Sequence, residues 1–335
     1  MHMADALLSP SVAGAMCCAS ALAAGVSIRN LKKRPVACRR LAPLMGVMGA
    51  FVFAGQMINF ALPGTGSSGH IGGGLLLAAL LGPEAGFLTL MLVLTVQCLL
   101  FADGGLMALG ANVWNMGFYA CFLGGCFIWH PLVEKAAMNG RLTRLRIMMA
   151  SVLAVTVSLQ LGAFSVTVET LLSGISSLPF GAFVLLMQPI HFAIGVVEGL
   201  ITGAVLAFVC EERPELLWTG NHSGEKETAA AAGIGHFAGG FAMAALVIAG
   251  GLSLLASENP DGLEWSIEKL TGSTELESSG AAAAIQQVTS LCADYGIPGV
   301  ESVWGNVLAA VLGVAVVTAA GFAVMRLMSC ASCTR

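Results

Sequence analysis

Charged residues are scarce in this chain. Only 10% of its 335 residues are charged, whereas 57% are hydrophobic and the mean hydropathy is +0.85. This balance excludes a soluble domain, which needs a polar shell around its core. Hydrophobic runs long enough to cross a hydrocarbon core of ~30 Å, about 20 residues each, recur along the whole length. We therefore predict an all-α integral membrane protein.

Motifs for catalysis and energy conversion are also missing. There is no G-x-x-x-x-G-K-[ST] loop, so the chain is not expected to hydrolyse ATP. There is no H-E-x-x-H helix and no G-x-S-x-G elbow, which argues against a hydrolase within the membrane. No inverted repeat indicates a stand-alone alternating-access carrier. The chain is predicted not to be an enzyme, and any energy-consuming step must rest on other subunits.

The hydrophobic segments predict two modules, a seven-helix bundle over residues 1–210 and a two-helix module over residues 234–335. The nine predicted crossings cover residues 11–28, 41–62, 71–81, 85–101, 105–129, 147–172, 180–209, 234–256 and 303–328. The third crossing is short, which fits a helix partly buried among its neighbours. Residues 211–233 form a polar linker, and residues 257–302 form an acidic loop between the last two crossings.

Lys and Arg residues gather on one side of this arrangement. They follow the first crossing, occupy a predicted loop at 130–146, and flank the linker and the end of the chain. Representative members are Arg29, Lys32, Lys33, Arg34, Lys135, Arg141, Arg213, Lys226, Arg326 and Arg335. Of the 15 basic residues, only Lys269 falls on the other side. The positive-inside rule then predicts a multi-pass protein of the cell (inner) membrane, with an extracytoplasmic N-terminus and a cytoplasmic C-terminus.

The first two residues, Met1 and His2, form a potential chelator. The α-amine and the amide nitrogen of His2 close a five-membered ring on a metal ion, and the amide nitrogen and Nδ1 of His2 close a six-membered ring. These three nitrogens lie in one plane, and a fourth donor would complete a square. A square of nitrogens suits Ni(II) or Cu(II), whereas zinc prefers a tetrahedron. The alternative is that a loose terminus carries this histidine by accident.

His70 is the candidate for the fourth corner. It ends a Gly- and Ser-rich stretch, Gly64–His70, on the same predicted side of the membrane as the N-terminus. Because protons compete with a metal ion for these nitrogens, affinity should fall on acidification. Copper binds nitrogen donors more tightly than nickel does, so its exclusion must depend on cellular availability.

Several polar residues are candidates for orienting these ligands. They are Ser67, Ser68, Asp103, Asn112 and Asn115. The alternative for residues within a crossing is ordinary hydrogen bonding between helices, worth about 0.6 kcal/mol each.

Two further features remain open. His191 and Glu198 are seven residues apart and so share a helix face. They are either a packed polar pair, a proton relay, or the lining of a passive divalent-cation channel or secondary carrier. The Cys330/Cys333 pair has metal-site spacing but no second pair beside it, and the sequence does not assign its role.

Three stretches resemble the CbiM/NikM family, the substrate-binding (S) components of energy-coupling factor transporters for cobalt and nickel. These stretches are Met1–Pro10, Ser68–His70 and Gly104–Asn112, and the likeness covers nearly all of the first module. Ala4 and Ala6 depart from the family's usual proline and glycine, at positions that shape the backbone. Pro260–Glu264 resembles the PDGLE-type signature of a two-span companion component, here fused to the S component.

The resemblance implies a substrate-capture subunit of an ATP-driven uptake transporter. It implies that Met1, His2 and His70 hold the metal, and that the partners are a transmembrane coupling (T) subunit and two cytoplasmic ATPase subunits. The transported ion is predicted to be Ni(II), because a planar nitrogen site suits it better than Co(II). Cobalt uptake for cobalamin synthesis is the alternative. No cofactor and no nucleic-acid partner are expected.

Overall fold

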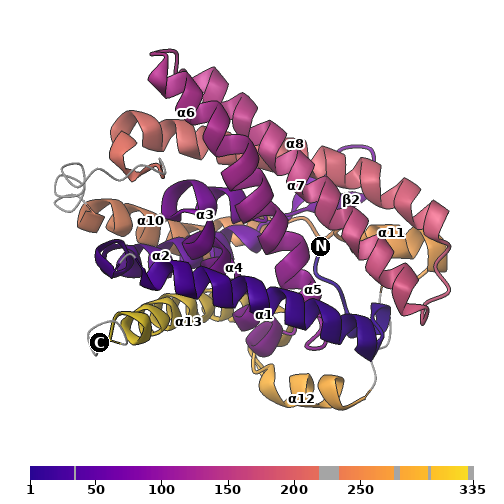
Figure 1. The fold of residues 1–335 in the computed structure, drawn as a ribbon. Helices are drawn as coiled ribbons and strands as arrows, with labels where there is room; N and C mark the ends of the chain where they lie inside the picture. Colours follow the sequence, from indigo (N-terminus) through magenta and orange to yellow (C-terminus); the bar gives the residue numbers. More distant parts are fainter. Residues whose placement is uncertain (34, 219–233, 275–279, 301–302, 331–335) are drawn as a thin grey trace.

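The protein is a bundle of helices with one small hairpin, and its computed structural model describes residues 1–33, 35–218, 234–274, 280–300 and 303–330 (Figure 1). The larger helices are α1 (Pro10–Lys32), α2 (Pro35–Gln56), α3 (Gly74–Leu81), α4 (Pro83–Phe101), α7 (Arg144–Ser173), α8 (Phe180–Glu212), α10 (Ile234–Gly250) and α13 (Val303–Cys330). One further long helix joins α5 (Leu109–Asn112), the π-helical η2 (Val113–Trp129) and α6 (His130–Met138). The short elements are η1 (Asp5–Leu7), β1 (Phe60–Leu62), β2 (Ser67–Gly69), η3 (Pro214–Leu216), η4 (Leu252–Leu255), α11 (Gly262–Thr271), α12 (Ala281–Thr289) and η5 (Ala293–Tyr295).

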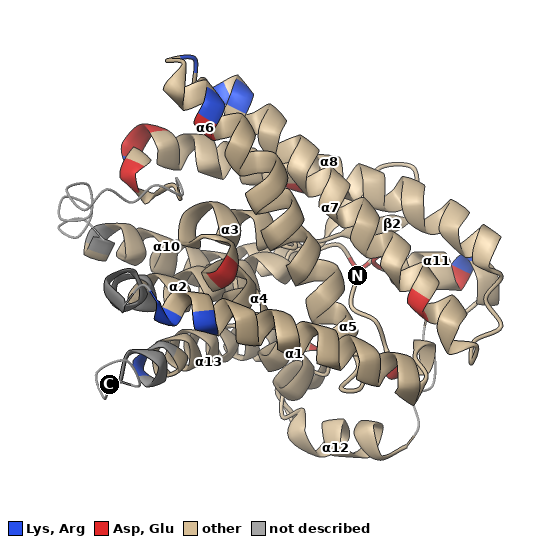
Figure 2. Ribbon diagram, in the orientation of Figure 1, with Lys and Arg blue, Asp and Glu red and all other residues tan. Residues whose placement is uncertain are grey.

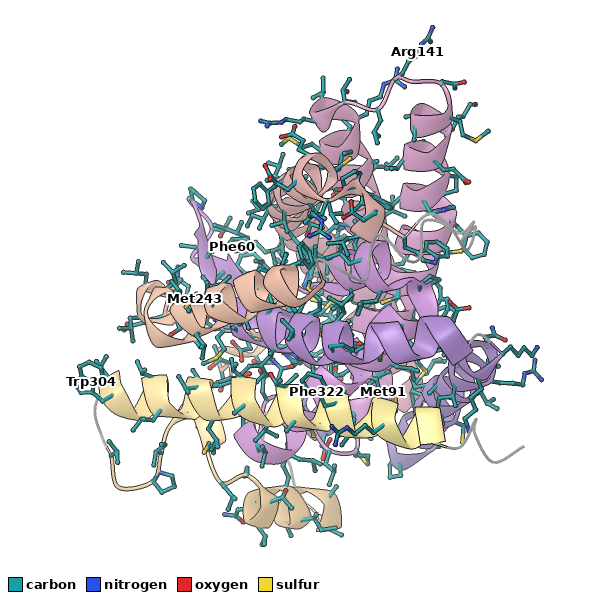
Figure 3. All side chains as sticks on the ribbon, turned by 90° about the vertical axis from the view of Figure 1, so that its left-hand side faces the viewer. Phe60, Met91, Arg141, Met243, Trp304 and Phe322 are labelled. Carbon is teal, nitrogen blue, oxygen red and sulfur yellow. The ribbon has the colours of Figure 1, made fainter. Side chains whose placement is uncertain are left out.

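Hydropathy and length account for the long helices. Among the described residues, six helices are long and apolar enough to cross a membrane, and α2 and α10 contain shorter apolar helices. Large apolar side chains cover the outside of these helices, with Leu22 on α1 72% exposed and Leu185 on α8 74% exposed. In Figure 3, Trp304 likewise projects from the end of α13. A surface of this kind suits lipid, and the protein is an all-α, multi-pass membrane protein, as predicted.

The short third crossing is α3, and all eight of its residues are buried. A helix of this length rises only about 12 Å, so it does not span the hydrocarbon core by its own length. Gly73 and Gly82 bound the helix with φ of +76° and +84°, which glycine adopts without strain. The expectation of a helix enclosed by its neighbours is confirmed.

Two predicted loops are wrong in extent. The helix that ends in α6 continues to Met138, and α7 begins at Arg144, so the loop expected at 130–146 shrinks to a short turn with Arg141 at its tip (Figure 3). Hydropathy marks where the apolar stretch stops, whereas helical hydrogen bonding continues beyond it. The acidic segment 257–302 also folds in part, into α11 and α12.

The Gly- and Ser-rich stretch before His70 forms a hairpin rather than an open loop. Strands β1 and β2 pair antiparallel, with Phe60 opposite Gly69. Gly64 and Gly66, with φ of +77° and +73°, make the turn. His70 follows β2 directly, so the hairpin fixes where its imidazole lies.

The second module packs on the first through α2. A Cβ built on Gly321 of α13 would lie 2.6 Å from the Cα of Gly46 on α2. Small residues at such a crossing let two helix backbones approach closely. Figure 2 shows Lys and Arg at the α6–α7 turn, the end of α1 and the end of α13, whereas α11 carries a single one, Lys269.

Candidate metal centre

The N-terminal segment lies buried inside the helical bundle. The amide of Met3 donates to Asn112 Oδ1 at 2.8 Å, and Met3 O accepts from Gly105 N at 2.8 Å and from Asn112 Nδ2 at 3.2 Å. Asp5 Oδ1 accepts from the amide of Ala108 at 2.9 Å. The Met1 side chain packs against α7, with its Cε 3.0 Å from a Cβ built on Gly162. These contacts fix the start of the chain.

The α-amine of Met1 lies next to His70, the predicted fourth ligand. Its nitrogen lies 3.0 Å from His70 Nε2. Neighbouring corners of a square with metal–nitrogen bonds of about 2.0 Å are roughly 2.8 Å apart, so this distance fits two adjacent ligands. Because the ammonium donates, Nε2 accepts, and the proton of the neutral ring lies on Nδ1, which faces Ile71 O at 3.4 Å.

His2 lies in the site but is not yet turned for chelation. Its ring stacks on that of His70, with centroids 5.3 Å apart and planes 13° from parallel. Its Nδ1 lies 3.0 Å from Asp103 Oδ1, while its Nε2 is buried without a partner. The predicted chelate uses Nδ1. The ring must therefore leave Asp103 and rotate before the square can close.

Burial sets the protonation of the site. Burial, reinforced by the positive N-terminus, lowers the pKa of His70 to about 3. Burial likewise lowers the pKa of His2. Burial alone would raise the pKa of Asp261, but the N-terminal ammonium, His70 and the hydrogen bonds from the amine and the Glu264 amide together outweigh it and hold that pKa well below its usual range. The site therefore presents neutral imidazoles, the form that binds metal ions, beside the ionised carboxylate of Asp261.

Most of the candidate supporting residues form hydrogen bonds with backbone groups and do not contact the predicted ligands. Asn112 clamps Met3, as described above. Asn115 donates to Glu169 Oε2 at 2.8 Å and faces the Met3 sulfur at 3.8 Å. Ser67 and Ser68 are fully buried and bond to the second module instead of to His70. Asp103 is the one candidate in direct contact with a predicted ligand.

Sequence reasoning missed two residues of the site, Asp261 and Tyr295. Asp261 Oδ2 accepts from the Met1 amine at 2.6 Å. The Tyr295 hydroxyl donates to Asp103 Oδ2 at 2.6 Å, and so backs the carboxylate that holds His2. Asp261 lies in the stretch that resembles the PDGLE signature. No local pattern, however, indicates contact with a residue 260 positions earlier.

A cavity of about 40 Å³ adjoins the amine and is lined by Met1, His70, His191, Glu198 and Asp261, among others. His191 Nδ1 faces Met187 O at 2.8 Å, and its Nε2 is buried without a partner. Glu198 Oε1 accepts from the amide of Gly73 at 3.0 Å. The two side chains share one chamber, and each has its own hydrogen-bond partner.

Within the described residues, no three His, Cys, Asp or Glu side chains form a ready metal cluster. Cys330 lies in α13, but Cys333 lies outside the described residues, so the predicted pair is not described. The fold and candidate site therefore define a helical membrane protein in which a buried chain terminus lies beside two imidazoles and a carboxylate.

Comparison with known proteins gives the family. Residues 2–216 match the CbiM family, described as the cobalt uptake substrate-specific transmembrane region, and residues 235–329 match the PDGLE domain. The CbiM match covers more than half of the chain, and the chain belongs to the CbiM family.

The relatives carry metal-transport names. A protein of Archaeoglobus fulgidus, named as a fused nickel transport protein NikMN, is 33% identical over 97% of this chain and 98% of its own length. The cobalt transport protein CbiM of Sorangium cellulosum is 30% identical over 57% of this chain and 83% of its own length. The crystal structure of a truncated transition metal transporter superposes with a TM-score of 0.51 and 28% identity, covering 63% of this chain and 99% of that one. The family and these relatives thus support transition-metal transport as the general function of this chain.

Proposed function

We propose that this chain is the substrate-capture subunit of an energy-coupling factor uptake transporter for nickel. The ligands of Ni(II) are the Met1 amine, the amide nitrogen and Nδ1 of His2, and Nε2 of His70. The observation that carries this proposal is the distance of 3.0 Å between the amine and His70 Nε2, deep inside the bundle. The relatives that share both modules and are named for nickel support the choice of metal.

Metal capture exchanges protons for the ion. The ammonium loses a proton to become a ligand, and the His2 amide loses a second one as its nitrogen binds. The His2 ring leaves Asp103, the proton that Nδ1 donated to that carboxylate moves to Nε2, and Nδ1 turns to the metal. The ion brings two positive charges and the amidate brings one negative charge. The ion and its nitrogen ligands together therefore carry a charge of +1, the same as the ammonium carried before capture.

The proposed planar arrangement favours nickel over cobalt. Four nitrogens in one plane suit Ni(II), whereas Co(II) more readily takes additional ligands. Cobalt, imported for cobalamin synthesis, is the competing substrate, and cobalt-named relatives of the first module make it the control metal. Competition between the two ions for one purified protein separates these outcomes.

Energy for uptake comes from other subunits in this proposal. The chain has no ATP-binding loop, so a coupling (T) subunit and two cytoplasmic ATPases complete the complex in the cell membrane. The Lys and Arg residues at the α6–α7 turn and at the ends of α1 and α13 favour a cytoplasmic position for that end. The metal site then faces the outside.

The first test is a Gly-Gly-Pro extension before Met1. The extension moves the amine away from His70 and converts the old amine into an amide, and its proline, which has no amide N–H, blocks a new chelate from the added residues, so nickel binding measured by calorimetry should fall by at least ~100-fold. His70→Ala should weaken binding to a similar degree. A C-terminal extension of the same length is the control and should bind as the parent does. An N-terminally extended protein that keeps the parent's affinity would rule out the chelate.

The second test separates capture from a passive channel or secondary carrier that uses His191 and Glu198. Vesicles that contain this chain alone should not accumulate nickel, whereas vesicles with the complete complex and ATP should. Uptake by the chain alone, abolished by Glu198→Gln, would favour the channel.

A further inference from the structure

We propose that Asp261, supplied by the second module, completes the metal centre as its charge-compensating carboxylate. This inference rests on the proposed function, since it concerns the same site. It adds that the first module alone lacks this carboxylate, so that the fused chain binds the ion more tightly than the first module would.

Asp261 is held so that one oxygen is fixed and the other faces the amine. It is the N-cap of α11, and its Oδ1 accepts from the amides of Leu263 at 2.8 Å and Glu264 at 2.9 Å. The Glu264 side chain accepts in return from the amide of Asp261 at 3.0 Å. This capping box leaves Oδ2 to the Met1 amine, at 2.6 Å. The carboxylate is only 15% exposed.

The segment that carries Asp261 is fastened to the hairpin that carries His70. The amide of Ser68 donates to Pro260 O at 2.8 Å, and the Ser68 hydroxyl donates to Asn259 O at 2.7 Å. The indole of Trp265 donates to Thr65 O at 3.0 Å. Hairpin and segment therefore place His70 and Asp261 around the same nitrogen.

Charge gives Asp261 its role in the loaded site. In the metal-free protein its negative charge balances the ammonium. After capture, the ion and the amidate together again carry a charge of +1, so the same carboxylate balances the loaded site without moving. A buried positive charge left without this partner is costly. Asp103 cannot take over the charge compensation at the amine, because its carboxylate contacts His2 and the Tyr295 hydroxyl.

The test is Asp261→Asn in the full-length protein. Asparagine is also a favoured N-cap and has nearly the same shape, so it removes the charge while keeping the start of α11. Nickel affinity should fall by about 10- to 100-fold, the usual effect of removing a group that supports metal ligands. The absorption spectrum at saturating nickel should stay that of the parent, because the four nitrogens remain. Asp261→Ser, which keeps a capping oxygen, should weaken binding by at least as much.

The matched control is Glu268→Gln, which removes one negative charge from the same helix away from the amine. It should bind nickel as the parent does. An Asp261→Asn protein with the parent's affinity would overturn the proposal while leaving the chelate intact, since the N-terminally extended protein tests the chelate separately. Loss of the parent's spectrum at saturation in a protein with native helix content would also overturn it, because Asp261 would then assemble the nitrogens rather than balance their charge.

Discussion

Two carboxylates from distant parts of the chain hold its first two residues. Asp261 faces the Met1 amine at 2.6 Å, and Asp103 faces His2 Nδ1 at 3.0 Å. Both carboxylates occupy donor atoms that the proposed chelate needs. The metal-free site is therefore held near its binding geometry but closed. An incoming ion must displace one proton from the ammonium and one from the His2 amide, and must break the hydrogen bond between His2 and Asp103, before the square forms.

The buried imidazoles predict how stability depends on pH. Burial lowers the pKa of His70 to about 3 and lowers that of His2, from an ordinary value near 6.5. Between these values the unfolded chain binds more protons than the folded one, so stability rises with pH across this window. Lowering the pH from about 7 to about 5 should therefore reduce the thermal midpoint of the metal-free protein.

The matched variant for this prediction is His70→Gln, which cannot be protonated. Its thermal midpoint should fall less between the two pH values than that of the parent. The Asp261 carboxylate does not interfere, because its pKa lies below pH 5 in either state. An equal loss of stability in both proteins would show that His70 is not the group responsible.

Among the elements, the long helices were the easiest to predict. Hydropathy located nearly all of them because twenty apolar residues have few alternatives in a membrane. The hairpin was harder, since each of its strands has only three residues. Helix α11 carried a readable signal, because Asp261 and Glu264 have the spacing of a capping box. That stretch was nevertheless predicted to belong to a loop.

The close crossing of helices α2 and α13 predicts how a substitution there changes stability. A side chain at Gly321 meets the backbone of Gly46, so Gly321→Val should separate the helices and destabilise the protein by about 1–3 kcal/mol. Thermal unfolding in detergent measures this change. Gly239→Ala on α10 is the control, because a Cβ there meets nothing within 4 Å. Equal midpoints for the two variants would contradict the close crossing.

Across the whole molecule, the metal site joins residues from the first and last thirds of the chain. The nitrogens of Met1, His2 and His70 could be proposed from the sequence, because chelation by a chain terminus is a local property. The positions of Asp261 and Tyr295 could not, because they depend on how α11 and η5 pack on the first module. The rotation of the His2 ring that metal binding requires could not be predicted either, because it follows from the hydrogen bond between His2 and Asp103.

The most direct measurement is a structure of the nickel-loaded, full-length protein that shows residues 1–3. The account predicts one ion with the Met1 amine, the His2 amide nitrogen, His2 Nδ1 and His70 Nε2 at about 2 Å in one plane, and Asp261 beside the amine. An ion bound elsewhere, for example at His191, with the N-terminal residues still held by Asp261 and Asp103, would contradict it.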